Sequence, residues 1–405
     1  MRAAHPLSPH AFSTLRRLTA LTAVMTLTLT MVSCSIGESN GDPVISSLTA
    51  QKADATVPRN SKSDMDNEPL SSAVGTVSMI TSDENRKKGA VSGDLTTTVV
   101  SRERSTDKFQ WAVSIKPAVA NQERTEYADN AQSAMSENMD LSSTGSAVVS
   151  PDGRYLSLIL LPAEQQSGET AADLRTHIVV LDTTTGKTVR NATVSGIVLG
   201  QALTNSTLAV ETAQNYFPAG SGKGTITTFS LTDTSAQPSS FPTDKWLVGT
   251  TRENLVLAPN LFSKDCSYGC SLTTVALVDT DGATNENVTG VTSVHPGGWI
   301  RRFTNPKAAS DFQQRLKAAS EDERKSLSPS REAVEQQLVN PSIKKTIDIT
   351  GKTTFERGVP TGPGLLVYQD VTTGNGSTES KPAFWLSSTD DGHPHTENLE
   401  QFKDE

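Results

Sequence analysis

The chain has 405 residues and a formal net charge of −9 at pH 7, with 45 acidic side chains against 36 lysines and arginines. This acidic balance argues against a protein that binds nucleic acid, because phosphates require a basic surface. Only 35% of the residues are hydrophobic and 5% are aromatic, which favours short strands and many turns over packed helices.

Residues 1–33 have the layout of a secretory signal. Arg2, Arg16 and Arg17 precede an uncharged apolar run over residues 18–32. The run has about 15 residues, fewer than the roughly 20 that a membrane-spanning helix needs. It therefore predicts a cleaved signal peptide rather than a retained span.

The segment Met31-Val32-Ser33-Cys34 resembles the lipobox of bacterial lipoproteins. The resemblance implies cleavage before Cys34 and a diacylglycerol on its sulfur, and such a double chain holds a protein firmly on a membrane. The protein would then be extracytoplasmic, anchored on the outer face of the cell membrane, with its net charge changed from −9 to −12. The alternative is an ordinary signal peptide that is cut nearby, with Cys34 incidental.

Residues 34–72 predict a disordered tether, because they are polar, rich in Ser, Asp, Asn and Lys, and show neither helical nor strand periodicity. The folded body would then occupy residues 73–405. Within it, short runs rich in Val, Thr, Ile and aromatic residues predict strands between turns of Gly, Asp, Asn and Pro. The runs outside the central region are 75–81, 95–102, 109–115, 345–349, 364–369 and 383–387. The polar residues 121–141 allow a marginal helix or a loop.

The clearest pattern covers residues 146–194, where four predicted strands alternate with tight turns at 150–154 and 182–187. Asp152 and Gly153 lie in the first turn, and Asp182 and Gly186 in the second. These are residue types that such turns require. The segments SPDGRYLSLILL and HIVVLDTTTGKTV resemble the blades of TolB-type and YVTN-type β-propellers. Weaker versions follow at residues 224–233 and 271–282.

The sequence therefore predicts an all-β, propeller-like body of about five to seven blades, complete or incomplete. A helical hairpin at about 306–339 interrupts it. Asn305-Pro306 and Ser328-Pro329 would each begin a helix, and the second helix would end at Asn340-Pro341.

Cys266 and Cys270 remain as one pair if Cys34 is lipidated. Disulfides persist outside the cytoplasm, and Gly269 allows the tight turn that a bridge between these positions needs. We therefore predict a structural disulfide. The alternative, a redox-active or metal-binding pair, lacks the C-x-x-C spacing of redox motifs.

Trp299, Arg301 and Arg302 stand directly before the predicted helical hairpin and form the candidate binding surface. Trp and Arg are favoured at the centres of protein interfaces. The alternative is a buried propeller tryptophan beside two solvated arginines.

Three further motifs are better explained without chemistry. The G-x-S-x-G pattern at residues 37–41 lies in the predicted tether, without the strand and helix that a nucleophile elbow needs. The glycines at 220–224 precede a predicted strand rather than a phosphate-binding helix, so they suit a hairpin tip. His393 and His395 near Asp390 and Asp391 are too loose a pattern for a metal site. We therefore expect neither a metal nor a cofactor.

These observations favour a binding or scaffolding protein that engages an envelope protein or glycan through a propeller face, rather than an enzyme. One alternative is a carbohydrate hydrolase or lyase that uses channel carboxylates such as Asp152 or Asp279. Another is a quinone-dependent propeller dehydrogenase. Such enzymes usually repeat a tryptophan docking motif, and the four tryptophans of this chain share no common motif.

Overall fold

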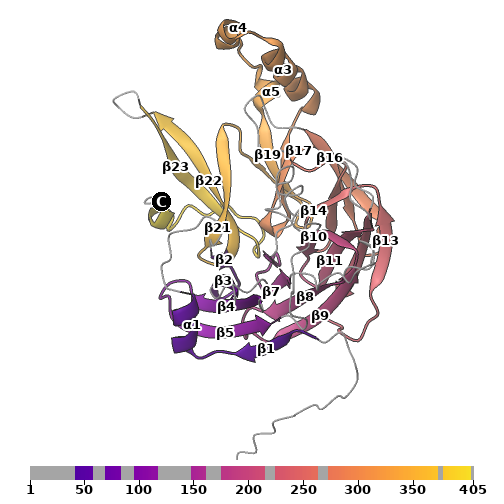
Figure 1. The fold of residues 1–405 in the computed structure, drawn as a ribbon. Coiled ribbons are helices and arrows are strands. Elements are labelled where there is room, and N and C mark those ends of the chain that lie inside the picture. Colours follow the sequence, from indigo (N-terminus) through magenta and orange to yellow (C-terminus); the bar gives the residue numbers. More distant parts are fainter. Residues whose placement is uncertain are drawn as a thin grey trace, which may run out of the picture. The chain divides into compact units, whose positions relative to one another are not determined.

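A computed structural model of the chain describes residues 42–57, 69–83, 95–116, 147–160, 175–214, 224–262, 272–372 and 377–402. All of these residues belong to one compact unit, Asn40–Glu405. They form five antiparallel sheets, here called A to E in chain order, with few helices (Figure 1). The all-β prediction is confirmed.

Sheets A, B and C hold the first thirteen strands. Sheet A has the order β1-β5-β4-β3-β2 and contains β1 (Val44–Ser47), β2 (Leu70–Ser71), β3 (Gly75–Asp83), β4 (Leu95–Glu103) and β5 (Phe109–Lys116). Sheet B contains β6 (Ala147–Val149), β7 (Tyr155–Ile159), β8 (Arg175–Asp182) and β9 (Thr188–Ser195). Sheet C contains β10 (Ile197–Leu203), β11 (Thr207–Ala213), β12 (Gly224–Ser230) and β13 (Ser239–Thr243).

Sheets D and E hold the remaining strands. Sheet D contains β14 (Trp246–Thr250), β15 (Leu255–Ala258), β16 (Thr273–Val278), β17 (Thr284–His295), β18 (Trp299–Phe303), β19 (Gln336–Asn340) and β20 (Lys345–Asp348). Sheet E contains β21 (Lys352–Val359), β22 (Gly362–Thr372) and β23 (Thr378–Ser387). The long strand β17 divides sheet D, because it pairs with β16 up to Val291 and with β18 from Val291 onward.

This topology is propeller-like. Sheets B and C are four-stranded meanders in which each strand pairs with the next in sequence, and β14–β17 repeat that order. The first strands of these units also lie side by side, since β10 contacts both β6 and β14. Apolar side chains fill the space between neighbouring sheets. One such core joins Val99 and Trp111 of sheet A to Leu156 and Val179 of sheet B. The structure thus confirms a propeller-like fold assembled from packed blades.

The predicted blade turns adopt the expected conformations. Gly153 and Gly186 have φ values of 74° and 68°, a region that side chains other than glycine avoid. A Cβ on Gly186 would lie 2.6 Å from the Trp111 ring. Asp182 caps its own turn, because its Oδ1 accepts the backbone N–H groups of Thr184 and Thr185.

A repeat that is hard to see in the sequence marks the first turn of several blades. A buried hydroxyl oxygen at the end of one strand accepts a backbone N–H three to five residues later. The four pairs are Ser72 with Gly75, Ser150 with Tyr155, Thr204 with Thr207 and Thr251 with Asn254. One hydroxyl thereby satisfies a backbone donor that the turn would leave unpaired.

Arg104 joins the first sheet to the last. Its guanidinium donates to the carbonyl oxygens of Val359 at 2.6 Å, Ser72 at 2.8 Å and Gly75 at 3.1 Å. Strands β2 and β21 contact each other at this junction. No described strand belongs to both sheet A and sheet E, so the Arg104 side chain links two separate sheets.

The predicted tether is wrong for residues 42–57 and 69–72. Strand β1 pairs with β5, and helix α1 (Ala50–Thr56) packs on sheet A with Ala53 fully buried. Arg102, itself buried, donates to the Asp54 carboxylate at 2.8 Å. Little of the segment is buried, so its polar residues face solvent. Its folding depends on contacts with sheet A rather than on local periodicity.

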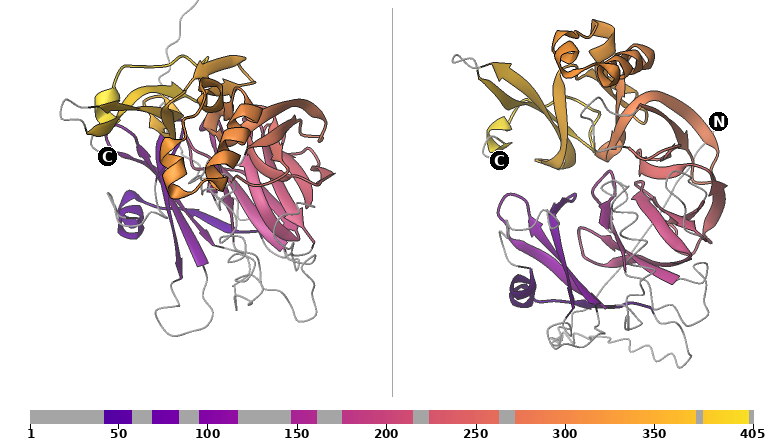
Figure 2. Two further views of the ribbon diagram at one scale, coloured as in Figure 1. Left: turned by 90° about the horizontal axis from the view of Figure 1, so that it is seen from above. Right: turned by 45° about the horizontal axis from the view of Figure 1, so that its top comes forward.

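The inserted helices are present between β18 and β19, as α3 (Pro306–Ala318), α4 (Glu321–Ser326) and α5 (Arg331–Val334). Figure 2 shows them grouped together, apart from α1. The expected second helix is wrong in its last part, because residues 336–340 form β19. Leu338 is fully buried there and pairs with both Arg301 and Ile347. Pairing on both edges outweighs a weak helical pattern.

Other predictions fall outside the described residues. These are the signal peptide with Cys34, the pair Cys266 and Cys270, and residues 121–141. Among the helices of the described segments, none has the length and apolar character needed to cross a membrane.

Candidate functional site

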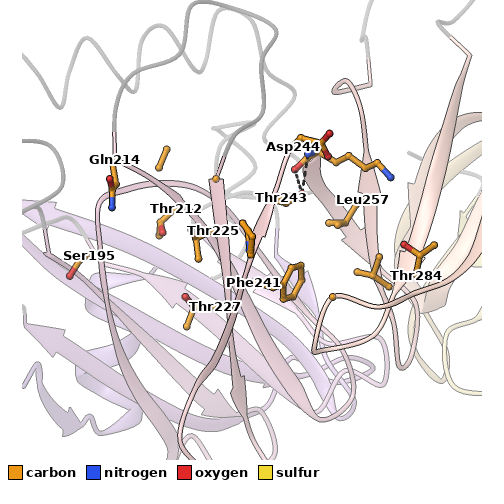
Figure 3. Close-up of a pocket in the computed structure, with 16 residues that line it drawn as sticks. Ser195, Thr212, Gln214, Thr225, Thr227, Phe241, Thr243, Asp244, Leu257 and Thr284 are labelled. Carbon is orange, nitrogen blue, oxygen red and sulfur yellow. Dashed lines mark hydrogen bonds between the residues drawn. The ribbon is translucent and has the colours of Figure 1, made fainter.

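A cleft of about 1110 Å³ opens beside sheets C and D (Figure 3). Sheet C supplies residues of β11, β12 and β13, and sheet D supplies Leu257, Val278 and Thr284. Pockets of about 300–1,000 Å³ hold ligands of drug size. This cleft is slightly larger than that range, so a ligand of at least drug size fits it.

Hydroxyl groups dominate the described part of the cleft lining. They belong to Ser195, Thr212, Thr225, Thr227, Thr243 and Thr284. Gln214 adds an amide, and Asp244 and Lys245 add one charge of each sign. Hydroxyl and amide groups both donate and accept hydrogen bonds, so this lining suits a neutral ligand that is rich in hydroxyls or amides.

Phe241 supplies the aromatic surface of the cleft. It stands on β13 opposite Ile226 and packs against the turn at Gly282. A Cβ at Gly282 would lie 2.6 Å from the Phe241 ring, and the φ of 88° at this glycine also disfavours any side chain. The turn of sheet D thus holds the ring of sheet C in place.

The turn at residues 243–245 is fixed at the rim of the cleft. Thr243 Oγ1 accepts the Lys245 N–H at 3.0 Å and donates to the Lys245 carbonyl at 3.0 Å (Figure 3). Asp244 and Lys245 are therefore presented by a closed turn instead of a loose loop, which lowers the entropy that binding would cost.

Glu211 lies behind the cleft wall, on β11 next to the lining residue Thr212. Its side chain is almost fully buried, and its Oε2 accepts the backbone N–H of Leu247 at 2.9 Å. Its Oε1 has no hydrogen-bond partner among the described residues and lies close to Gly224. Burial raises the pKa of Glu211 to about 7, and the Leu247 hydrogen bond lowers it only in part.

The candidate binding surface does not lie in this cleft. Trp299 is only 1% exposed and packs in the core between sheets D and E, which matches the alternative of a buried propeller tryptophan. Arg301 is bound to Gln336, Thr354 and the Lys352 carbonyl. These three partners hold the guanidinium in place of solvent, and burial lowers the pKa of Arg301.

The basic groups of the insertion have local partners. Lys307 pairs with Asp311, Lys325 with Asp322 and Arg331 with Glu335, at 3.0–3.2 Å. Arg315 lies over the Phe312 ring and Arg324 donates to a backbone carbonyl. These charges are therefore largely balanced within the insertion.

The carboxylates considered for hydrolysis serve their own turns. Asp152 accepts the Arg154 N–H, and Asp279 accepts the N–H groups of Asp281 and Ala283. Neither lines the cleft, whose described lining includes a single carboxylate, Asp244.

The histidine cluster near the C-terminus is bound internally. His395 stacks on Trp385 with 3.9 Å between ring centroids, and its two nitrogens contact Asp390 at 2.7 Å and Glu397 at 2.8 Å. Burial lowers the pKa of His395, but the hydrogen bonds that its ring donates to these carboxylates outweigh burial and raise the pKa above 6.5. The described residues contain no group of three or more His, Cys, Asp or Glu side chains arranged to hold a metal.

The cleft itself was missed by the sequence analysis, because its polar lining is mostly threonines spread over several strands of sheets C and D. The one usable signal is the pair Thr225 and Thr227 at alternate positions of β12, opposite Pro242 and Ser240 of β13.

No protein-family model matches the chain, and no curated protein sequence matches it. Among solved structures, the chain is similar to the β-propeller domain of the Trilobed protease from Pyrococcus furiosus, with 12% identity, 80% of this chain and 94% of that chain covered, and a TM-score of 0.34. It is similar to the acylaminoacyl peptidase of Pyrococcus horikoshii (9% identity, 78% and 51% covered, TM-score 0.33). It is also similar to TolB from Acinetobacter baumannii (9% identity, 79% and 65% covered, TM-score 0.29).

The chain thus spans about half of that peptidase and 65% of TolB. Because each TM-score lies below 0.5, the assignment of a propeller-like fold rests on the strand topology and not on these matches.

Proposed function

We propose that this chain is an exported, lipid-anchored binding protein of the bacterial cell envelope, and that it holds a glycan segment in the cleft of sheets C and D. The observation that carries the proposal is the chemistry of the cleft, which combines six hydroxyl side chains, one of which (Thr243) closes its own turn, with one amide and one fixed aromatic ring. Such a set can hydrogen-bond the hydroxyls of a sugar and pack on one apolar face of it.

A two-carboxylate glycosidase is the weaker proposal for this cleft. Glycoside hydrolysis uses a pair of carboxyl groups on either side of the bond that breaks. Asp244 is the one carboxylate among the described lining residues. Retention of a glycan, without cleavage, therefore suits the cleft better.

Titration of the purified protein with soluble fragments of envelope glycan, followed by calorimetry, tests the proposed ligand. Phe241→Ala and Thr225→Val should each weaken binding by about tenfold, which corresponds to about 1.4 kcal/mol. Phe355→Ala is the matched control, because this phenylalanine is 53% exposed on sheet E and lies outside the cleft. Equal affinities for the wild type and the two cleft variants would reject the cleft as the binding site.

The anchor is tested separately. Cys34→Ala should leave the protein uncut or release it from membranes, and a metabolic lipid label should enter the wild type only. A wild-type protein that takes up no label would exclude lipid anchoring, whereas glycan binding could still be measured.

A further inference from the structure

Three polar side chains form a hydrogen-bonded series between sheets D and E. Ser293 Oγ lies 2.8 Å from His295 Nε2, and His295 Nδ1 lies 3.0 Å from Glu356 Oε1. The groups therefore follow one another in the order hydroxyl, imidazole and carboxylate.

The fold explains why these groups meet. Ser293 and His295 are two residues apart on β17, so their side chains point to the same face of the strand. Glu356 stands on β21, the first strand of sheet E. The His295 side chain is 10% exposed and that of Glu356 is 51% exposed, so solvent reaches the Glu356 end of the series. Ser293, at the other end, is half-buried.

The carboxylate determines the tautomer of the imidazole. An ionised carboxylate only accepts hydrogen bonds, so His295 carries its proton on Nδ1 and donates it to Glu356. Nε2 then has a free lone pair, which accepts the hydroxyl proton of Ser293. A serine hydroxyl becomes a nucleophile when a base oriented by a third group takes its proton.

A fixed cation lies beside the serine. Arg301 is the direct cross-strand partner of Ser293, so the two side chains share one face of sheet D. Its guanidinium is held by Gln336 Oε1 at 2.8 Å, the Lys352 carbonyl at 3.0 Å and Thr354 Oγ1 at 3.3 Å. Guanidinium has five N–H groups, so two remain beyond these three bonds.

We propose that Ser293, His295 and Glu356 form a catalytic triad that hydrolyses short-chain acyl esters, with Arg301 as the residue that stabilises the oxyanion. An ester suits the site because an alcohol leaves more readily than an amine. A short acyl group suits it because Arg301, the cross-strand neighbour of Ser293, and Thr354, whose hydroxyl binds Arg301, are both polar. This activity is separate from glycan binding in the cleft of sheets C and D.

The reaction has two balanced halves. Ser293 Oγ attacks the acyl carbon while its proton moves to His295 Nε2, and Glu356 stabilises the resulting imidazolium. The bond from the acyl carbon to the alcohol oxygen then breaks, and that oxygen takes the proton from Nε2. Water next attacks the acyl group on Ser293 and gives a proton to Nε2. Cleavage of the acyl–Oγ bond releases the carboxylic acid, and Ser293 recovers its proton.

The full chain, with p-nitrophenyl acetate and a fluorophosphonate probe, provides the test. We expect hydrolysis of the ester and a covalent adduct that peptide mass spectrometry places on Ser293. Ser293→Ala should abolish both. His295→Ala should lower the rate of labelling by about 100-fold or more, in line with the effects of removing a general base. Glu356→Gln should lower it by about tenfold or more, because the proton on Nδ1 is no longer fixed.

Two matched variants separate catalysis from general damage. Ser380→Ala removes an exposed serine of sheet E, and His393→Ala removes a histidine outside the series. Both should keep the wild-type rate, and circular dichroism should give the same spectrum for all variants. Ester hydrolysis that survives in Ser293→Ala, or a wild-type protein that takes no label on Ser293, would overturn the proposal.

Discussion

The ionisation of Glu211 should make the protein less stable as the pH rises. Its ordinary pKa is 4.5, and burial raises it to about 7 in the folded chain. Between these values the folded state holds a proton that the unfolded state has released. The contribution of Glu211 to stability therefore falls from pH 4.5 to about 7 and then stays level. The difference between the two pKa values corresponds to about 3 kcal/mol.

Glu211→Gln isolates this effect. The amide oxygen can still accept the Leu247 N–H, and the amide NH2 replaces the protonated oxygen near Gly224, so at pH 4.5 the variant should match the wild type. At pH 8 the variant should be more stable by about 3 kcal/mol, because it carries no buried charge. Urea unfolding followed by tryptophan fluorescence at several pH values measures the difference.

A control and a refuting result follow from the same experiment. Glu286→Gln, at an exposed glutamate on β17, is the control for the loss of one surface carboxylate. If the difference between Glu211→Gln and the wild type stays constant from pH 4.5 to 8, Glu211 does not carry an uncompensated charge in the folded state.

Three other perturbations test the junctions of the fold. Gly186→Ala should lower the unfolding free energy by about 2–4 kcal/mol, because it combines a left-handed backbone with a clash at Trp111. Gly351→Ala is the control: a Cβ there meets no atom within 4 Å, so the variant should lose only the free energy of placing alanine in a left-handed conformation. Arg104→Leu should cost about 3 kcal/mol or more in thermal or urea unfolding, since it leaves carbonyl oxygens unpaired between sheets A and E. The stabilising contribution of His395 should be complete below pH 6.5 and be lost as the pH rises through its raised pKa. Amide hydrogen exchange of residues 395–402 should then become faster in the wild type. An equal increase of the exchange rate in His395→Gln would contradict this.

The sequence by itself determined the local β-structure. Strands at 75–83, 95–103 and 109–116 are found within two residues of the predicted runs. The turns of Asp152–Gly153 and Asp182–Gly186 could be predicted because turn chemistry is local: glycine permits a positive φ, and an aspartate oxygen reaches N–H groups two residues on. Asn305 was likewise recognisable as a helix cap, and its side chain accepts the Ala308 N–H.

Only the tertiary structure decided which of these elements meet. Residues 42–57 are folded because sheet A offers β1 an edge and α1 a surface, and residues 336–340 are a strand because β18 and β20 pair with both edges. His295 and Glu356 are 61 residues apart in sequence, and their contact depends on how sheet E packs on sheet D. The cleft likewise needs two sheets to exist. Contacts between sheets join residues that are far apart in sequence, so local propensity does not encode them. They form because the apolar faces of all the sheets are buried together in one fold.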